Sequence, residues 1–204
     1  MSLHFLLTAF VVCAAPGTGV VYTLAMGLGR GRKAALAAAF GCTFGIVPAL
    51  LAAILGLAAL LHTSALLFNA VKIAGIAYLL WMAWGALRQT GALAIRPVEA
   101  SRDPLWRVAW RGTLLNVLNP KLSIFFLALL PPFLSGDPAR ATVEMAGLGT
   151  VFMGMTFAIF AVYGLFAGAF RSRVLSSRRA MVWLNRSFAA VFAALAGRLA
   201  LERA

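Results

Sequence analysis

The feature that most constrains this chain is a succession of six long apolar stretches separated by short polar segments. A helix needs roughly 20 apolar residues to cross a membrane, and each of the first five stretches is long enough. Asn185, Arg186 and Arg198 interrupt the sixth, so the sequence predicts six crossings, with five as the alternative. The stretches are Leu3–Leu28, Ala34–Leu61, Ser64–Leu87, Gly112–Phe133, Val143–Phe170 and Ala180–Leu201.

Composition supports the same fold class. Hydrophobic residues make up 63% of the 204 residues and charged residues only 11%, whereas average soluble domains carry roughly 45–50% and about 25%. A chain this short has too few polar groups to cover such an apolar excess. The composition therefore excludes an ordinary soluble protein, a nucleic-acid-binding module and a disordered chain. It predicts an all-α integral membrane protein whose surroundings are the lipid bilayer.

The basic residues predict the orientation in the membrane. The first, third and fifth connections between the stretches hold twelve Lys and Arg residues, and the second and fourth hold one. Cytoplasmic loops carry such an excess of Lys and Arg. The odd connections are therefore predicted to be cytoplasmic and both termini periplasmic.

The longest polar segment divides the chain into two groups of three stretches. We expect one transmembrane domain over residues 1–204, with halves at about 1–90 and 108–204 joined by a basic cytoplasmic linker at about 88–111. Because three is odd, the two halves would insert with opposite orientations, as the inverted repeats of many transporters do. One half rocking against the other would then give alternating access.

Two pairs of glycines have the spacing that lets helices approach closely. Gly41 and Gly45 lie in the second stretch, and Gly164 and Gly168 in the fifth. Small residues four apart form one narrow face of a helix. Each pair is therefore predicted to pack against a neighbouring helix.

Three places in the apolar stretches carry residues that are unusual in lipid-facing helices, namely helix-breaking prolines or lysines. All three lie at a similar depth. At 1.5 Å per residue, Pro16-Gly17 is about 18–21 Å from either end of its stretch, and Lys72 and Asn119-Pro120-Lys121 are each roughly 12 Å from the nearer end. All three fall in the middle half of a core about 30 Å thick. They are predicted to meet near the midplane.

Interrupted helices and lysines at that depth have two interpretations. Non-helical backbone inside a membrane is tolerated against protein or a water-filled cavity, and its positive helix ends and buried cations attract anionic groups. Alternatively, the prolines only kink helices and the lysines reach an interface. The first interpretation gives a substrate site made of Pro16, Gly17, Lys72, Asn116, Asn119, Pro120 and Lys121.

The sequence contains no catalytic or cofactor motif. Its five acidic residues lie in connections or at the ends of the stretches, and it has neither a His-rich cluster nor a phosphate-binding loop. An embedded hydrolase or phosphotransferase needs metal ligands or a nucleophile with its base. We therefore expect no enzyme activity, no metal and no cofactor.

With these residues in view, the chain resembles the LysE/RhtB family of bacterial amino-acid exporters over nearly its whole length. The strongest signal is the block from Arg111 to Lys121, followed by Phe125-Phe126 and Leu130-Pro131-Pro132-Phe133. Other matching segments are Ala15-Pro16-Gly17-Thr18, Gly29 to Leu36 and Lys72 to Leu79. The chain departs from the family where Thr18 replaces a proline, and where Ile46 replaces a frequent acidic residue.

The resemblance implies a secondary transporter of the bacterial inner membrane that exports amino acids or related small metabolites, driven by the proton motive force. Because the chain has two buried cations and no buried acid, a neutral or acidic substrate is favoured over a cationic one. A membrane channel or a non-transporting membrane scaffold is the alternative. The sequence leaves the oligomeric state open, a homodimer included.

Overall fold

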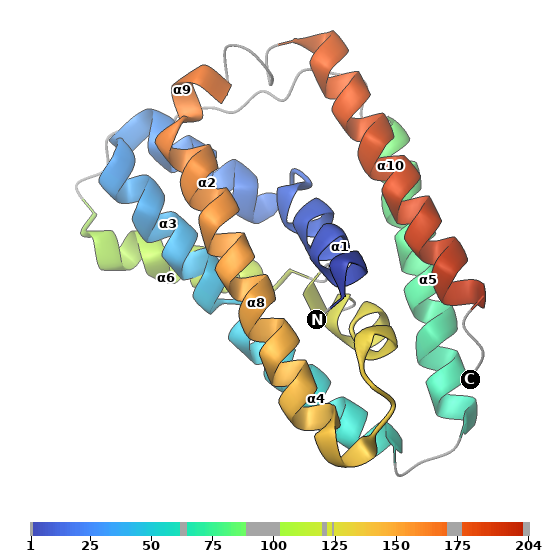
Figure 1. Ribbon diagram of the computed structural model, residues 1–204. Coiled ribbons are helices and arrows are strands. Elements are labelled where there is room, and N and C mark those ends of the chain that lie inside the picture. Colours follow the sequence, from blue (N-terminus) through green and yellow to red (C-terminus); the bar gives the residue numbers. More distant parts are fainter. Residues whose placement is uncertain are drawn as a thin grey trace.

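A computed structural model describes residues 2–61, 65–88, 103–119, 122–123, 125–170 and 177–201 (Figure 1). The regular elements of this part of the chain are all helices, and it contains no strand. The elements in chain order are α1 (Leu3–Ala14), α2 (Thr18–Arg30), α3 (Arg32–Phe44), α4 (Val47–Leu61), α5 (Ala65–Arg88), α6 (Leu105–Val117), the π-helix η1 (Phe125–Leu129), the 3₁₀-helix η2 (Pro131–Phe133), α8 (Pro138–Leu165), α9 (Ala167–Phe170) and α10 (Arg178–Leu201).

Three helical segments of the described part are long and apolar enough to cross a membrane: Arg32–Gly56, which takes in α3 and most of α4, Ala139–Leu165 and Arg178–Leu201. The pair α1 and α2 passes the same test together but is bent by 56°, so it adds a fourth span if the bent pair counts as one. The all-helical membrane class is thereby confirmed. The six predicted crossings, which also need α5 and the region from α6 to η2, stay a prediction.

The fourth apolar stretch is not one helix. The structure begins α6 at Leu105, seven residues before the predicted stretch, and ends it at Val117. Pro104 precedes the helix in an extended conformation, as a residue that fixes φ and lacks an N–H readily does at a helix start. Arg107 and Arg111, predicted to lie in the linker, are therefore helical residues.

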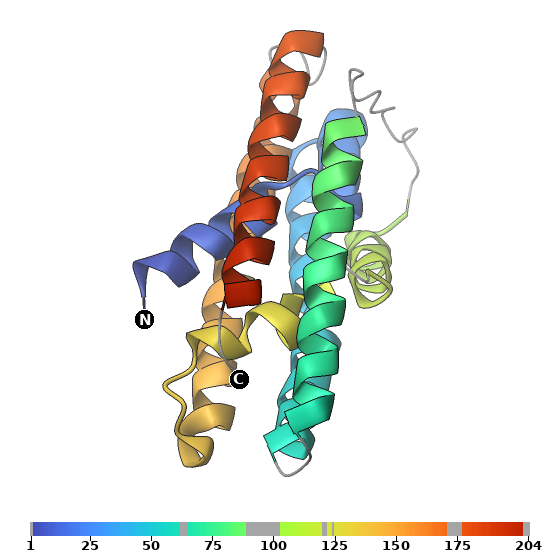
Figure 2. The same cartoon turned by 90° about the vertical axis from the view of Figure 1, so that its right-hand side faces the viewer.

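The helices form two neighbouring groups (Figures 1 and 2). In one group α3 packs against α2, α6 and α8, and in the other α5 packs along α10. Contacts of α1 with both α8 and α10, and of η1 with both α4 and α5, join the groups. The break after α1 therefore lies between helices of both groups, with Ala15 buried, whereas Leu118 at the end of α6 is exposed.

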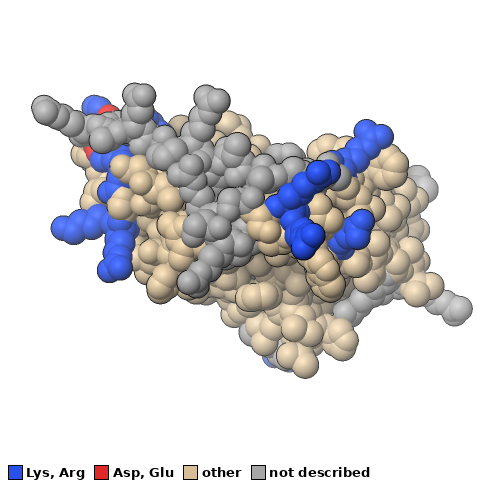
Figure 3. Space-filling view, turned by 90° about the horizontal axis from the view of Figure 1, so that it is seen from above, with Lys and Arg blue, Asp and Glu red and all other residues tan. Residues whose placement is uncertain are grey.

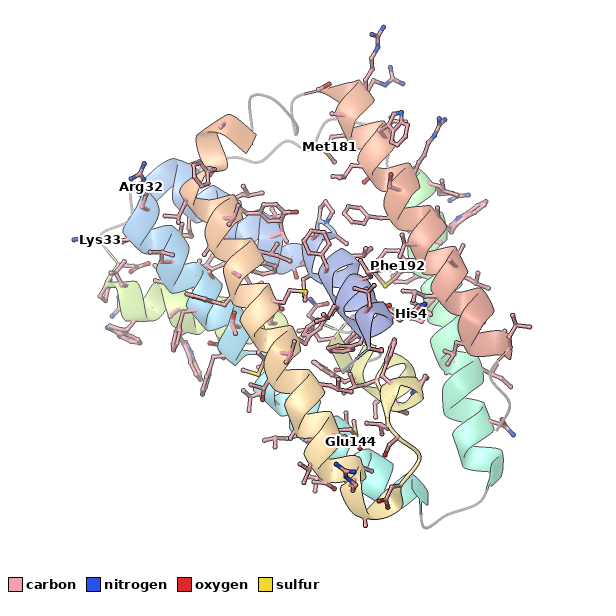
Figure 4. All side chains as sticks on the ribbon, in the orientation of Figure 1. His4, Arg32, Lys33, Glu144, Met181 and Phe192 are labelled. Atoms are coloured by element: carbon pink, nitrogen blue, oxygen red, sulfur yellow. The ribbon has the colours of Figure 1, made fainter. Side chains whose placement is uncertain are left out.

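Charged side chains are distributed differently at the two ends of the molecule. Arg32 and Lys33 lie at the upper left of Figure 4, and Glu144 lies near the bottom. Seen from the top, Lys and Arg side chains gather in two groups over the upper end (Figure 3). This separation agrees with the predicted grouping of the basic connections on one side.

Glycines bring the backbones of α3 and α6 into contact. A Cβ on Gly41 would collide with the carbonyl of Ala109, and one on Gly45 with the carbonyl of Thr113. The predicted close approach at Gly41 and Gly45 is confirmed. Gly164 likewise contacts α2 and α3, but a Cβ on Gly168 would meet no described atom within 4 Å. The helix ends at Leu165, so Gly168 is not on the same helical face.

Replacing Gly41 with Ala is expected to loosen the packing of α3 against α6. The added methyl would force two backbones apart, and overpacking of this kind costs about 1–3 kcal/mol. Thermal unfolding of the purified protein in detergent measures the loss. Gly154→Ala is the matched control, because a Cβ at Gly154 in α8 has nothing described within 4 Å. Equal melting temperatures for the two variants would contradict the prediction.

Candidate functional site

The first element of the site is the break between α1 and α2. Helix α1 ends at Ala14, and Gly17 caps α2 in an extended conformation. Pro16 stands between them and has no N–H to continue the helix. The hydroxyl of Tyr163 in α8 donates to the carbonyl of Ala14 at 2.9 Å. A side chain from another helix thus supplies a hydrogen bond that the interrupted helix lost.

The second element is the end of α6. The helix stops at Val117, and the N–H of Asn119 bonds the carbonyl of Asn116 at 3.1 Å in a tighter turn. The N–H of Leu122 then bonds the carbonyl of Asn119. The predicted break at this place is therefore present. Pro120 and Lys121 lie outside the described residues.

Asn116 connects this end of α6 to a third irregularity, between α3 and α4. In a continuous helix the N–H of Ile46 would bond the carbonyl of Cys42, but it bonds the carbonyl of Thr43 instead. Asn116 Nδ2 donates to the carbonyl of Cys42 at 2.6 Å. The Asn116 side chain is buried, and its Oδ1 accepts a long 3.5 Å bond from Asn119 Nδ2.

The break between α1 and α2 and the end of α6 meet at a small chamber of about 30 Å³. This volume holds about two water molecules. Of the predicted site residues, Gly17, Asn116 and Asn119 line it. The side chains of Cys13 and Thr156 add polar atoms, 3.2 Å apart. The remaining lining residues are Val12, Ala15, Gly19, Val20, Leu122, Phe152 and Phe160.

A wider and more open cavity of about 490 Å³ lies next to the chamber. Its size falls within the roughly 300–1,000 Å³ of small-molecule sites. Asn119 lines both spaces, so the two are neighbours. The other lining residues are Thr18, Tyr22, Arg111, Leu114, Leu115 and Leu118.

Four of the predicted site residues are not placed in either space, and two of them, Pro120 and Lys121, lie outside the described residues. Pro16 lies in the first break, between the lining residues Ala15 and Gly17. Lys72 belongs to α5, and its side chain is outside the described part. The prediction that the two lysines reach the site stays a prediction.

Arg111 is a cavity residue that sequence reasoning assigned to the linker. A signal for it exists, since Arg111, Leu115 and Asn119 recur every four residues, which places them near one helical face. Thr18, Thr156 and Cys13 were also missed. Nothing in their local sequence separates them from residues that only fill space between helices.

Among the described residues, no group of three His, Cys, Asp or Glu side chains is placed to hold a metal ion.

Tyr163→Phe is expected to destabilise the first break. It removes the donor to the Ala14 carbonyl, and because this bond is only partly buried the loss should be near the low end of the roughly 1–3 kcal/mol that a buried acceptor without its partner costs. Thermal unfolding in detergent again measures the effect. Tyr78→Phe is the control, because no hydrogen bond of the Tyr78 hydroxyl is found within the described part of the chain. An unchanged melting temperature for Tyr163→Phe would contradict this role.

Comparisons with known proteins find relatives that match nearly the whole chain. The sequence model of the family described as LysE type translocator matches residues 10–203. The chain is 32% identical to an uncharacterized membrane protein of Vibrio cholerae, over 99% of this chain and 97% of that protein. It is 28% identical to a leucine efflux protein of Enterobacter sp. (96% and 93% covered). It is also 28% identical to a homoserine/homoserine lactone efflux protein of Salmonella typhimurium (98% and 95% covered). No solved structure matches the chain.

Proposed function

Because the chain belongs to the LysE type translocator family, we propose that it is a secondary transporter that exports amino acids or related small metabolites. The observation that carries the proposal is the meeting of two interrupted helices at one chamber, next to a wider cavity. Interrupted helices at mid-membrane depth form the substrate sites of several transporter folds. The efflux proteins that the chain resembles support the same activity.

The proposed architecture is a pair of inverted three-helix repeats, about 1–90 and 108–204, within one transmembrane domain. Contacts between corresponding elements support it, since α3 packs against α8 and α5 against α10. The breaks also correspond, because each interrupts the first element of its half. The basic end of the molecule would face the cytoplasm, with both termini on the periplasmic side of the inner membrane.

The proposed substrate site is the chamber with the residues around it. The N-terminus of α2 begins beside Gly17, and the first amides of a helix carry partial positive charge. Lys121, with Lys72 assisting, would complete a positive environment for a substrate carboxylate. The chamber volume of about 30 Å³ then corresponds to a closed form that must widen to take an amino acid.

A neutral or acidic substrate fits this environment better than a cationic one. Ile46, at the position where the family often has an acidic residue, is fully buried beside the third irregularity. An apolar side chain there offers no carboxylate to a substrate ammonium group. We also propose that the proton motive force drives export, as the family resemblance implies, and the proton would then have to bind elsewhere in the chain.

Efflux from dipeptide-loaded cells tests the proposed function. Cells expressing the protein should release one or more amino acids faster than cells without it, and release should saturate and be slowed by competitors. Unsaturable release would favour a channel. No release over a broad panel, with the protein verified in the membrane, would contradict amino-acid export and leave a scaffold as the better interpretation.

Lys121→Ala should lower this efflux at least several-fold while the amount of protein in the membrane stays similar. The reason is the loss of a cation that the proposal places at the substrate carboxylate. Lys33→Ala is the control, because Lys33 is an exposed residue of the basic end. An equal fall in efflux and in protein level for Lys121→Ala would instead indicate a structural role.

A further inference from the structure

The wider cavity presents one cation and an apolar wall. Arg111 is the charged residue among its seven lining residues, and Leu114, Leu115 and Leu118 face the same space. Tyr22 also lines it, and its hydroxyl already donates to the carbonyl of Val108 at 2.8 Å. Positive charge and leucine side chains therefore dominate the chemistry of this cavity.

Arg111 is held in place by a carboxylate that it shares. Its Nη1 lies 2.9 Å from Asp103 Oδ2, while Arg107 Nη1 lies 3.3 Å from Asp103 Oδ1. Arg30 Nη2 donates to the backbone carbonyl of Asp103 at 2.5 Å. Because one carboxylate lies among three guanidinium groups, this cluster keeps an excess of positive charge.

The guanidinium of Arg111 has capacity for a second anion. It carries five N–H donors, its side chain is 54% exposed, and its contact with Asp103 is made through Nη1. Arginine binds carboxylates through two parallel hydrogen bonds when the geometry allows, which adds strength and orientation. Asp103 fixes the guanidinium beside the cavity without enclosing it.

We propose that Arg111 binds the carboxylate of a substrate amino acid at the mouth of the transport path, and that the leucine wall selects apolar side chains. This inference rests on the proposed export function and adds the substrate class and the residue that recognises it. Asn119 lines both the cavity and the chamber. A substrate bound to Arg111 would therefore lie next to the chamber at which the interrupted helices meet.

The sequence provides a matched control for Arg111. Arg107 lies one helical turn away, pairs with the same carboxylate and has the same 54% side-chain exposure. Arg107 is not among the residues that line the cavity. A difference between the two variants therefore reports on the cavity, since both remove one charge and one partner of Asp103.

Counterflow in everted membrane vesicles tests the inference without assuming a coupling ion. Vesicles preloaded with unlabelled leucine take up labelled leucine from the face that is cytoplasmic in cells. Arg111→Ala should raise the half-saturating leucine concentration about tenfold or more, with a smaller effect on the maximal rate. Arg107→Ala should change it by less than about twofold. Protein levels are compared by immunoblot.

Competition by leucine analogues tests substrate recognition directly, because a purely structural role of Arg111 would not change which analogues compete. Leucinol, which lacks the carboxylate, should compete poorly with leucine in the wild type and about as well as leucine in Arg111→Ala. Glycine, which lacks the apolar side chain, should compete poorly in both. Asp103→Asn keeps an oxygen that can accept a hydrogen bond from Arg111 but removes the competing negative charge. It should therefore lower the half-saturating concentration, which tests the same site if Arg111→Ala fails to reach the membrane.

The outcomes separate the two proposals. Equal effects of Arg111→Ala and Arg107→Ala, or unchanged discrimination against leucinol, would overturn the role of Arg111 while leaving export intact. Preference for glutamate over leucine in the wild type would overturn the apolar substrate class. Absence of any amino-acid counterflow in the wild type, with the protein present, would contradict the proposed function itself.

Discussion

This structure depends on giving every interrupted backbone group a hydrogen-bond partner inside the membrane. The bond from Asn116 to the carbonyl of Cys42, at 2.6 Å, is one such partner. Inside a bilayer no water is at hand for a backbone group that leaves a helix, so the protein must supply each partner itself. Here the breaks between α1 and α2 and between α3 and α4 each leave a carbonyl that a distant side chain satisfies. Tyr163 and Asn116 donate these hydrogen bonds, which also join α8 to α1 and α6 to α3.

These bonds explain how a chamber lined by a few polar groups persists in so apolar a chain. Phe152 and Phe160 close one side of the chamber, and Phe152 stacks on Phe125 with ring centroids 4.7 Å apart. The aromatic rings keep the chamber small, while the Asn116 and Asn119 amides and the Thr156 hydroxyl supply hydrogen-bonding groups within it. Enlarging the chamber requires the aromatic cluster to move, not only the helix ends.

Sequence reasoning located two of the three breaks because proline and glycine change the backbone wherever they stand, but it took residues 34–61 as one continuous stretch and missed the break between α3 and α4. Pro16-Gly17 and the end of α6 near Asn119 needed no tertiary information, nor did the close approach at Gly41 and Gly45. Arg111 was misjudged because the predicted linker ran through the start of α6, and a charged residue on that helix looked like a loop residue. The sequence does not predict the roles of Cys13, Thr156 and Tyr163, because these roles depend on which helices become neighbours. Tertiary packing, which local patterns do not encode, decides that.

The packing of α3 on α6 bears on how the proposed transport cycle works. These helices belong to different halves of the chain, yet the backbone of α6 sits directly on Gly41 and Gly45. Rigid rocking of one half against the other would have to slide that contact, and closely packed backbones do not shear gradually. The segments that lack helical hydrogen bonds, around Pro16 and Asn119, change conformation at lower cost. We therefore expect α3 and α6 to move as one body and the two breaks to act as its hinges. In that arrangement Asn119, at the boundary between chamber and cavity, changes its surroundings whenever a hinge moves.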